Sequence, residues 1–194
     1  MIDTLRSVAH LQKEIGDELF AALISSDNTD AVRKFAVSLV KGSDHYVVGK
    51  GGGTYPVVID YGKSVEEMVV YGNYNWSNPD TTSKNFPLSG TGNVSVSLEF
   101  VHLNKSVSTR EVSDYLEANG LRAATIEELL VFGMTYPEIQ REFPVVALGS
   151  SWVDSRSRRR VPYLVGHGSG RKLYLHWSAY DWDDVCRFLA VRKS

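Results

Sequence analysis

"GLRAATIEELLVFG", residues 120–133, is the stretch that decides the fold. Gly120 accepts the left-handed backbone that ends many helices. Thr125 and Glu128 have the spacing of a capping box, in which each side chain bonds a free backbone N–H at the start of a helix. The apolar residues that follow Thr125 continue this second helix. The stretch therefore predicts the end of one helix and the beginning of the next.

The same signal occurs twice more before this stretch. Ser108 and Glu111 form a capping box that opens the helix closed by Gly120, and Ser64 and Glu67 open "KSVEEMVVYG", which stops at Gly72. Segment 93–103, "NVSVSLEFVHL", alternates apolar and polar residues instead, as a half-buried strand does.

The last third of the chain contains short β-like pieces: "PVVAL", "RRVPYLV", "RKLYLHW" and "CRFLAVR". Polar or glycine-containing turns separate them. Helices followed by such pieces predict an α+β domain with short, loop-rich antiparallel strands. In "KLYLHW" the alternation places Leu173 and Leu175 on one face and Tyr174 and His176 on the other.

The N-terminal part has a different pattern. Apolar residues recur at helical spacing in segments 2–25 and 31–42, separated by a polar turn, which predicts a helical hairpin. We expect it to pack against the main domain, with oligomerisation through its apolar stripe as the alternative. The predicted division is a hairpin over 1–42 and the main domain over 43–194. A β-hairpin, Tyr46–Val48 with Val57–Ile59, is expected to begin the second part.

Composition narrows the functional classes. The 194 residues are 43% hydrophobic, which suits a globular core, and the net charge of −2 argues against nucleic-acid binding through a general positive field. The single cysteine, Cys186, excludes an intramolecular disulfide framework and a cysteine-based zinc knuckle. No segment has the length of a membrane span or the apolar block of a signal peptide, so we expect a cytoplasmic protein without a membrane anchor.

Two segments carry a resemblance to a known family. "GLRAATIEELLVFG" resembles the helix-entry segment of the formylglycine-generating-enzyme branch of the C-type lectin fold, and "WDDVCRFLAVRK" is similar to the closing strand of that branch. With "VALGSSW" between them, the likeness covers roughly residues 108–192. The matching residues of the first segment are Gly120, Arg122, Ala124, Thr125, Glu128 and Leu129.

Within that fold the chain most resembles the variable proteins of diversity-generating retroelements. In that family a reverse transcriptase makes errors at template adenines, and the errors rewrite codons near the 3′ end of the target gene. Adenine-directed change of Asn codons cannot produce Glu, Gln, Met, Lys or Trp. Ser150–Arg187 contains no Glu, Gln or Met, and all its acids are aspartates, whereas glutamate is plentiful earlier in the chain.

The resemblance implies a ligand-binding protein, not an enzyme, with a diversified C-terminal surface and a protein or glycan as its partner. Adaptable Tyr, Ser and Asp side chains on a fixed scaffold suit that role. Trp152, Trp177, Trp182 and Lys172, out of reach of the mutagenesis, are expected in the scaffold, with Leu173, Leu175, Phe188, Leu189 and Val191 in the core. The expected variable residues are Val153, Ser155, Arg156, Ser157, Arg158, Tyr163, Val165, His167, Tyr174, His176, Ser178, Ala179, Tyr180 and Asp181.

The arginines at 156 and 158–160 allow other interpretations. Three cations on one face would suit phosphates, but on a strand Arg159 points away from Arg158 and Arg160. Asp154 and the acids at 181–184 could pair with the run. A solvated role, an internal ion pair and a place in the ligand surface all stay open, and no nucleic-acid partner is expected.

Calcium binding and catalysis are the remaining alternatives. "WDD" at 182–184 is similar to a calcium-binding element of lectins, but the tripeptide that completes such sites is missing, and two aspartates rarely supply enough oxygens. Cys186 with His176 or His167 would be a nucleophile and base, but no orienting group is identifiable. We expect no metal and no cofactor. A lectin-like domain of fixed specificity and a formylglycine-generating-type enzyme remain the alternative functions, and the oligomeric state stays open.

Overall fold

The computed structural model describes residues 53–168 and 170–193, all of which belong to one compact unit, Lys50–Ser194. The predicted helical hairpin over 1–42 and the strand Tyr46–Val48 lie outside the described residues. Val57–Ile59, the other half of the expected β-hairpin, lies in the first described strand. Among the described residues no helix is both long and apolar enough to cross a membrane.

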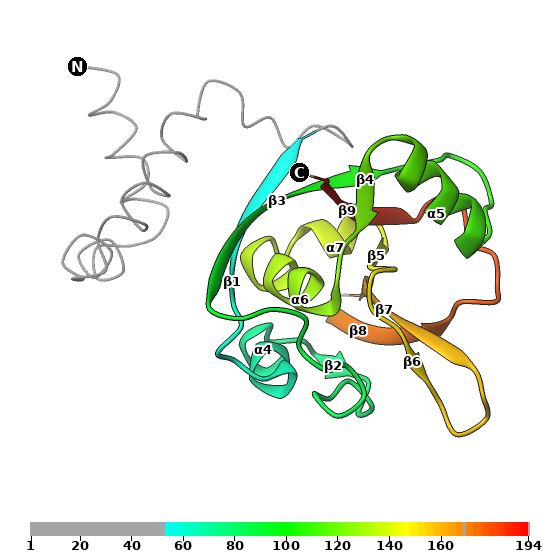
Figure 1. Ribbon diagram of the computed structural model, residues 1–194. Helices are drawn as coiled ribbons and strands as arrows, with labels where there is room; N and C mark the ends of the chain where they lie inside the picture. The colour runs from blue at the N-terminus through cyan, green and yellow to red at the C-terminus, as the bar shows by residue number, and fades with distance from the viewer. Residues whose placement is uncertain (1–52, 169, 194) are drawn as a thin grey trace, which may run out of the picture. The chain divides into compact units, whose positions relative to one another are not determined.

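Within the described residues, nine strands form one sheet in which β1, β3, β9, β5, β7, β8 and β2 are successive neighbours (Figure 1). β4 adds to β9, and β6 adds to β7. The strands are β1 (Thr54–Asp60), β2 (Trp76–Ser77), β3 (Asn93–Val101), β4 (Leu121–Ala123), β5 (Val145–Val146), β6 (Trp152–Val153), β7 (Arg159–His167), β8 (Gly170–Trp177) and β9 (Arg187–Arg192).

This mixture of helices and strands confirms the α+β class, with two departures from the expected strands. β5 pairs with β9 in parallel, and β2 pairs with β8 in parallel, so the sheet is not wholly antiparallel. β7 has nine residues and extends two residues beyond the predicted "RRVPYLV", whereas β3 ends at Val101, two residues before the end of the predicted segment 93–103. Parallel pairing was missed because it joins segments that are distant in sequence and carries no turn signal of its own.

The helices are α4 (Val65–Tyr71), α5 (Thr109–Ala118), α6 (Ile126–Thr135) and α7 (Ile139–Glu142). The three predicted capping boxes are confirmed at Ser64, Ser108 and Thr125, each with both reciprocal hydrogen bonds. Gly120 follows the C-cap of α5 with φ +68°, a left-handed conformation that glycine adopts without steric cost. Capping depends on residues within one turn, which explains why it could be predicted without knowing the fold.

The alternation predicted for β3 is confirmed in its second half. Leu98 is fully buried, and Phe100 packs against the main core, but Val94 at the start of the strand is exposed. Val94 lies opposite fully buried Ile59 of β1, so at this end of β3 the alternating sequence is not matched by burial.

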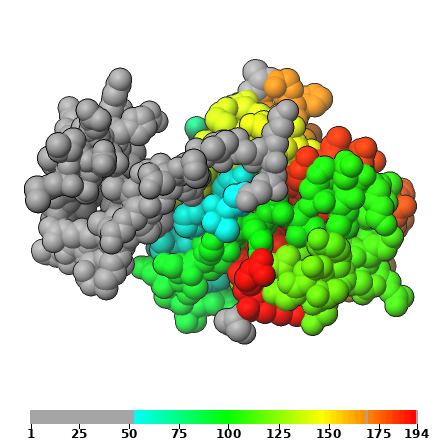
Figure 2. Space-filling view, turned by 90° about the horizontal axis from the view of Figure 1, so that it is seen from above, coloured from blue at the N-terminus to red at the C-terminus, as the bar shows by residue number. Residues whose placement is uncertain are grey.

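Two hydrophobic cores lie on opposite sides of the sheet. The main core joins α4, α6 and α7 to the inner face of the strands, with Leu129, Leu164, Leu173 and Leu189 fully buried in it. The second core joins α5 and β4 to the other side of β9 and β7. In Figure 1, α6 and α7 lie on one side of β5 and β9 and α5 on the other. Figure 2 shows residues of the C-terminal strand, in red, beside green segments from the middle of the chain.

Two arginines connect the core helices to the sheet. Arg122 of β4 makes a two-pronged ion pair with Glu128 of α6, at 2.9 and 2.6 Å. Buried Arg171 of β8 donates to the Gly72 carbonyl at the end of α4, to the Gly133 carbonyl and to Gln140 Oε1. It therefore satisfies carbonyls near the C-terminal ends of two helices, where positive charge is favourable.

Candidate functional site

The antiparallel hairpin of β7 and β8 divides its side chains between two faces. Opposite residues share a face, so Leu164 with Leu173 lies on the inner one and Tyr163 with Tyr174 on the other. The inner leucines are fully buried, whereas the two tyrosines are half-buried. We call the second side the outer face of the hairpin. The alternation predicted for "KLYLHW" is confirmed.

A continuous chain of ring contacts runs along the outer face. Trp76 of β2 lies 4.6 Å from Tyr174, measured between ring centroids, and Tyr174 stacks on Tyr163 at 5.7 Å. Tyr163 meets His176 at 5.8 Å, and His176 meets Tyr180 at 6.2 Å. We call these five side chains the aromatic face. Its two ends are the most open, with Trp76 40% and Tyr180 57% exposed.

Buried residues support the aromatic face from below. Trp182 is buried and lies 4.8 Å from His176, and its indole Nε1 donates to Thr109 Oγ1 at 2.9 Å. The Thr109 hydroxyl in turn donates to the Ser178 carbonyl at 2.7 Å. These bonds join the turn after β8 to the first residue of α5, so the position of Tyr180 depends on the second core.

The β6–β7 loop continues the same surface, and Asp154 holds it together. Oδ1 accepts the backbone N–H groups of Arg156 and Arg158 at 2.9 and 3.0 Å, and Oδ2 accepts Nε of Arg158 and of Arg160 at 2.9 and 3.0 Å. Burial by itself would raise the pKa of Asp154, but these hydrogen bonds outweigh it and lower the pKa well below its ordinary value.

These contacts show how the arginines at 158–160 are used. Arg158 and Arg160 converge on Asp154, so the internal ion pair, one of the alternatives left open, is present, while exposed Arg159 points away and donates to Ser151 Oγ at 2.7 Å. In the part of the chain that the structure describes, the acids at 181–184 form no ion pair with them. The run therefore does not present three free cations on one side.

Burial also sets the protonation of the aromatic face. It lowers the pKa of His176, an effect that the positive charge of Arg160 reinforces and Asp183 opposes. It raises the pKa of the Tyr163 hydroxyl, with the neighbouring Tyr174 and Cys186 adding to the effect. At neutral pH, His176 is therefore a neutral imidazole and Tyr163 a neutral phenol. The centre of the aromatic face carries no charge of its own.

The structure places the expected variable residues in three neighbouring groups. The β6–β7 hairpin carries Val153, Ser155, Arg156, Ser157 and Arg158, of which Arg158 is already engaged by Asp154. The outer face carries Tyr163, Val165, Tyr174 and His176, with exposed His167 at the end of β7. The turn after β8 carries Ser178, Ala179, Tyr180 and Asp181. The expected scaffold residues Trp152 and Trp182 pack against the main core and within the second core, and Trp177 is half-buried against Tyr180.

Two residues of the surface lie where the sequence did not indicate them. Trp76 is an exposed end of the aromatic face, although the sequence did not assign it to the ligand surface. Lys172, expected in the scaffold, lies on the outer face opposite Val165, with its ammonium 6.0 Å from the Tyr174 ring centre. The parallel pairing of β2 with β8 places Trp76 opposite Lys172, a contact that no local sequence signal reveals.

The surroundings of the residues considered for metal binding and catalysis do not support either role. Trp182 is buried, while Asp183 and Asp184 are exposed, and among the described residues no three His, Cys, Asp or Glu side chains are grouped as metal ligands would be. Burial raises the pKa of the Cys186 thiol to about 11, helped by Asp183, although a backbone hydrogen bond and Arg187 oppose it. A buried thiol with a raised pKa is a weak nucleophile at neutral pH. His102 bonds the Asp184 carbonyl through Nε2 at 2.7 Å.

Fold and site together define a mixed α/β protein with a rigid hairpin that displays an aromatic face. No protein-family model, curated protein or solved structure matches the chain.

Proposed function

We propose that the chain is a ligand-binding protein with a C-type-lectin-like fold, and that its aromatic face and β6–β7 loop contact a protein partner. We further propose that these are the positions that retroelement mutagenesis rewrites. On this proposal the protein works by binding, not by catalysis, and its specificity depends on side chains that can change without altering the fold.

The aromatic face is the observation that carries this proposal. Five linked rings offer large contact area with few rotatable bonds, so little conformational entropy is lost when a partner binds. Tyrosine, tryptophan and arginine are also the residues that dominate binding energy at protein interfaces. Exposed Arg156 in the β6–β7 loop and exposed Arg159 at the start of β7 would add polar contacts of the kind found at the rim of an interface.

The residues that carry the family resemblance also support the proposed fold. Gly120, Arg122, Thr125 and Glu128 form one connected unit: a left-handed turn, a capping box and an ion pair at the entry to α6. Because each of these residues has a structural role at the start of the helix, we expect the same residue types wherever this helix entry occurs.

A display library tests the binding role directly. Tyr163, Tyr174, His176 and Tyr180 are randomised together on the full chain, and the library is selected against hen lysozyme as a defined protein target. Binders that remain folded are expected, with thermal unfolding lowered only modestly. The matched control library randomises inner Leu164 and Leu173 and is expected to lose folded clones. No binders from the first library, or equal loss of folding in both, would contradict the proposal.

Two further measurements separate its parts. Diversification requires a near-repeat of the codons for Ser150–Arg187, differing at adenines, beside a reverse-transcriptase gene, and lack of such a repeat would refute that part alone. A glycan array with and without EDTA tests the partner. Calcium-dependent glycan binding would contradict a protein partner and would support the alternative, a lectin of fixed specificity.

A further inference from the structure

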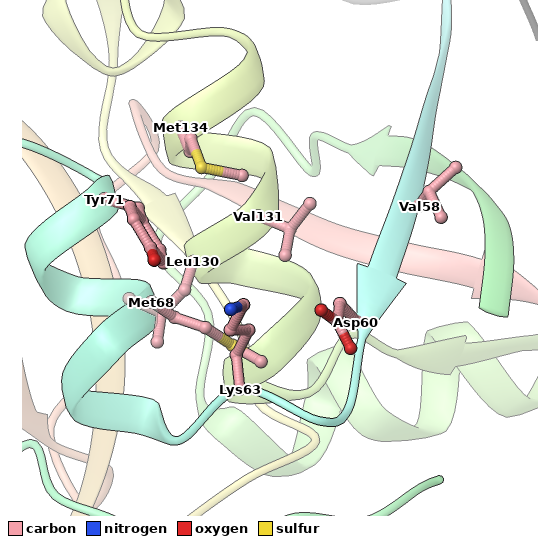
Figure 3. A pocket seen from close by; sticks show the side chains of 8 residues that line it. All are labelled: Val58, Asp60, Lys63, Met68, Tyr71, Leu130, Val131 and Met134. Carbon is pink, nitrogen blue, oxygen red and sulfur yellow. The ribbon is translucent and has the colours of Figure 1, made fainter. Parts of the chain in front are cut away.

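A separate pocket of about 220 Å³ lies between β1, α4 and α6 (Figure 3). It shares no residue with the aromatic face. Its volume is below the roughly 300–1,000 Å³ of pockets that hold drug-sized molecules. A ligand that fills it is therefore the size of a single amino acid.

The floor of the pocket is apolar. Met68 of α4 and Leu130 and Val131 of α6 are buried beneath it. Val58, Tyr71 and Met134 form its rim and are unusually open for large apolar side chains, at 42%, 54% and 43% exposed. Gathered apolar side chains at the surface mark interaction sites more often than single ones do. The two methionines add polarisable, adaptable walls that suit an aliphatic or thioether group.

One turn brings opposite charges to this pocket. The Lys63 amide donates to the Asp60 carbonyl at 3.1 Å, which closes a tight turn between β1 and α4, and both side chains line the pocket (Figure 3). Asp60 Oδ1 accepts the Gly62 N–H at 2.9 Å, which leaves Oδ2 for another donor. Lys63 Nζ lies 5.8 Å from the Tyr71 ring centre. Within the part of the chain that the structure describes, neither charge belongs to an ion pair.

We propose that this pocket binds a free α-amino acid with an aliphatic or thioether side chain, such as leucine or methionine. The ligand carboxylate pairs with the Lys63 ammonium, its ammonium pairs with Asp60 Oδ2, and its side chain enters the space over Met68, Leu130 and Val131. A simple carboxylate would be repelled by Asp60 and a simple amine by Lys63, so the two charges together select a zwitterion.

Amide NMR titration of the full chain with L-leucine tests the proposal. Saturable shifts are expected at Lys63 and Val131, while 4-methylpentanoate and 3-methylbutylamine, which each lack one charge, bind at least about tenfold more weakly because each loses a charge-assisted hydrogen bond. No saturable shift up to about 10 mM L-leucine, well beyond a millimolar Kd, overturns the proposal. Equal binding by either truncated ligand does the same.

Variants test the assigned contacts. Lys63→Met and Asp60→Asn are each expected to weaken L-leucine binding about tenfold or more, and the amide oxygen introduced by Asp60→Asn still accepts the Gly62 N–H. Lys105→Met and Asp114→Asn, at exposed positions outside the pocket, are the matched controls and are expected to bind as the parent chain does. Unchanged binding by both pocket variants, or equal weakening by the controls, refutes the site. Tyr174→Ser is expected to leave leucine binding intact, so this proposal and that for the aromatic face fail separately.

Discussion

The two faces of the β7–β8 hairpin have the same backbone and opposite surroundings. Inner Leu164 and Leu173 are fully enclosed by the main core, and Arg171 beside them has carbonyl partners in two other segments. On the outer face, Val161 belongs to the second core and Tyr163 packs at its edge, while Tyr163 and Tyr174 stack on each other and remain half-exposed. The inner face is enclosed along the hairpin, and the outer face is covered only in part.

This difference predicts unequal costs for side-chain changes on the two faces. A change on the inner face leaves a cavity or an unpaired polar group, which costs several kcal/mol. A change on the outer face exchanges partly solvated contacts for others, at a cost near 1 kcal/mol. Side-chain changes should therefore be better tolerated on the outer face, which is the face proposed to bind a ligand.

The sharpest test compares two neighbouring residues of β8. Leu173→Ala empties a fully buried position, and we expect the free energy of unfolding to fall by about 3 to 4 kcal/mol. Tyr174→Ser removes half-exposed ring contacts, and we expect a loss of about 1 kcal/mol. Urea unfolding measures both values. A larger loss for Tyr174→Ser than for Leu173→Ala would contradict the distinction between the faces.

The reactivity of Cys186 tests how well the second core, which packs beneath the outer face, shields this thiol from solvent. With the thiol pKa raised to about 11, the thiolate fraction at pH 8 is about 100-fold lower than for a thiol of ordinary pKa. We expect labelling by a disulfide reagent to be about 100-fold slower in the folded chain than in urea. Because the thiol pKa is raised in the folded chain, the protonated thiol contributes to folding stability. This contribution is fully present below the ordinary thiol pKa and is lost as the pH rises through about 11. Equal labelling rates in the folded chain and in urea would show that the second core does not shield the Cys186 thiol.

Arg171 and Lys172, adjacent cationic residues of β8 on opposite faces of the hairpin, allow the same comparison. Arg171→Met leaves the Gly72 and Gly133 carbonyls and Gln140 without this donor, and we expect a loss of about 2 kcal/mol in thermal or urea unfolding. Lys172→Met, on the outer face, is the control and is expected to change stability by less than about 0.5 kcal/mol. Similar effects of the two changes would mean that the buried bonds do not distinguish the faces.

The smallest effect is expected in the β6–β7 loop. Because hydrogen bonds lower the pKa of Asp154, its contribution to loop stability is present above the ordinary aspartate pKa of about 3.9 and is lost as the pH falls through the lowered value. Carboxyl NMR should give a midpoint well below about 3.9, and Arg160→Gln should raise it. A midpoint at or above the ordinary value would show that the loop is not held by this carboxylate.

Local features of the fold could be predicted because their causes are local. The capping boxes at Ser64, Ser108 and Thr125 and the alternation in β8 depend on residues a few positions apart. The contacts of Asp154 also lie within six residues of it, and the pattern of the arginines anticipated them. Long-range pairs could not be anticipated. Trp76 meets Tyr174 because β2 pairs with β8, and Gly72 accepts from Arg171 because the end of α4 packs against β8, and both contacts join segments distant in sequence.

The starts of α4, α5 and α6 and the two chemically different sides of β8 follow from the sequence alone. How each side of the hairpin is covered depends on tertiary packing. Period-two alternation defines the faces of a strand, but burial depends on which other element packs there. The second core encloses Val161 and Trp182 but leaves Tyr163 and Tyr174 half-buried, and this boundary separates it from the aromatic face.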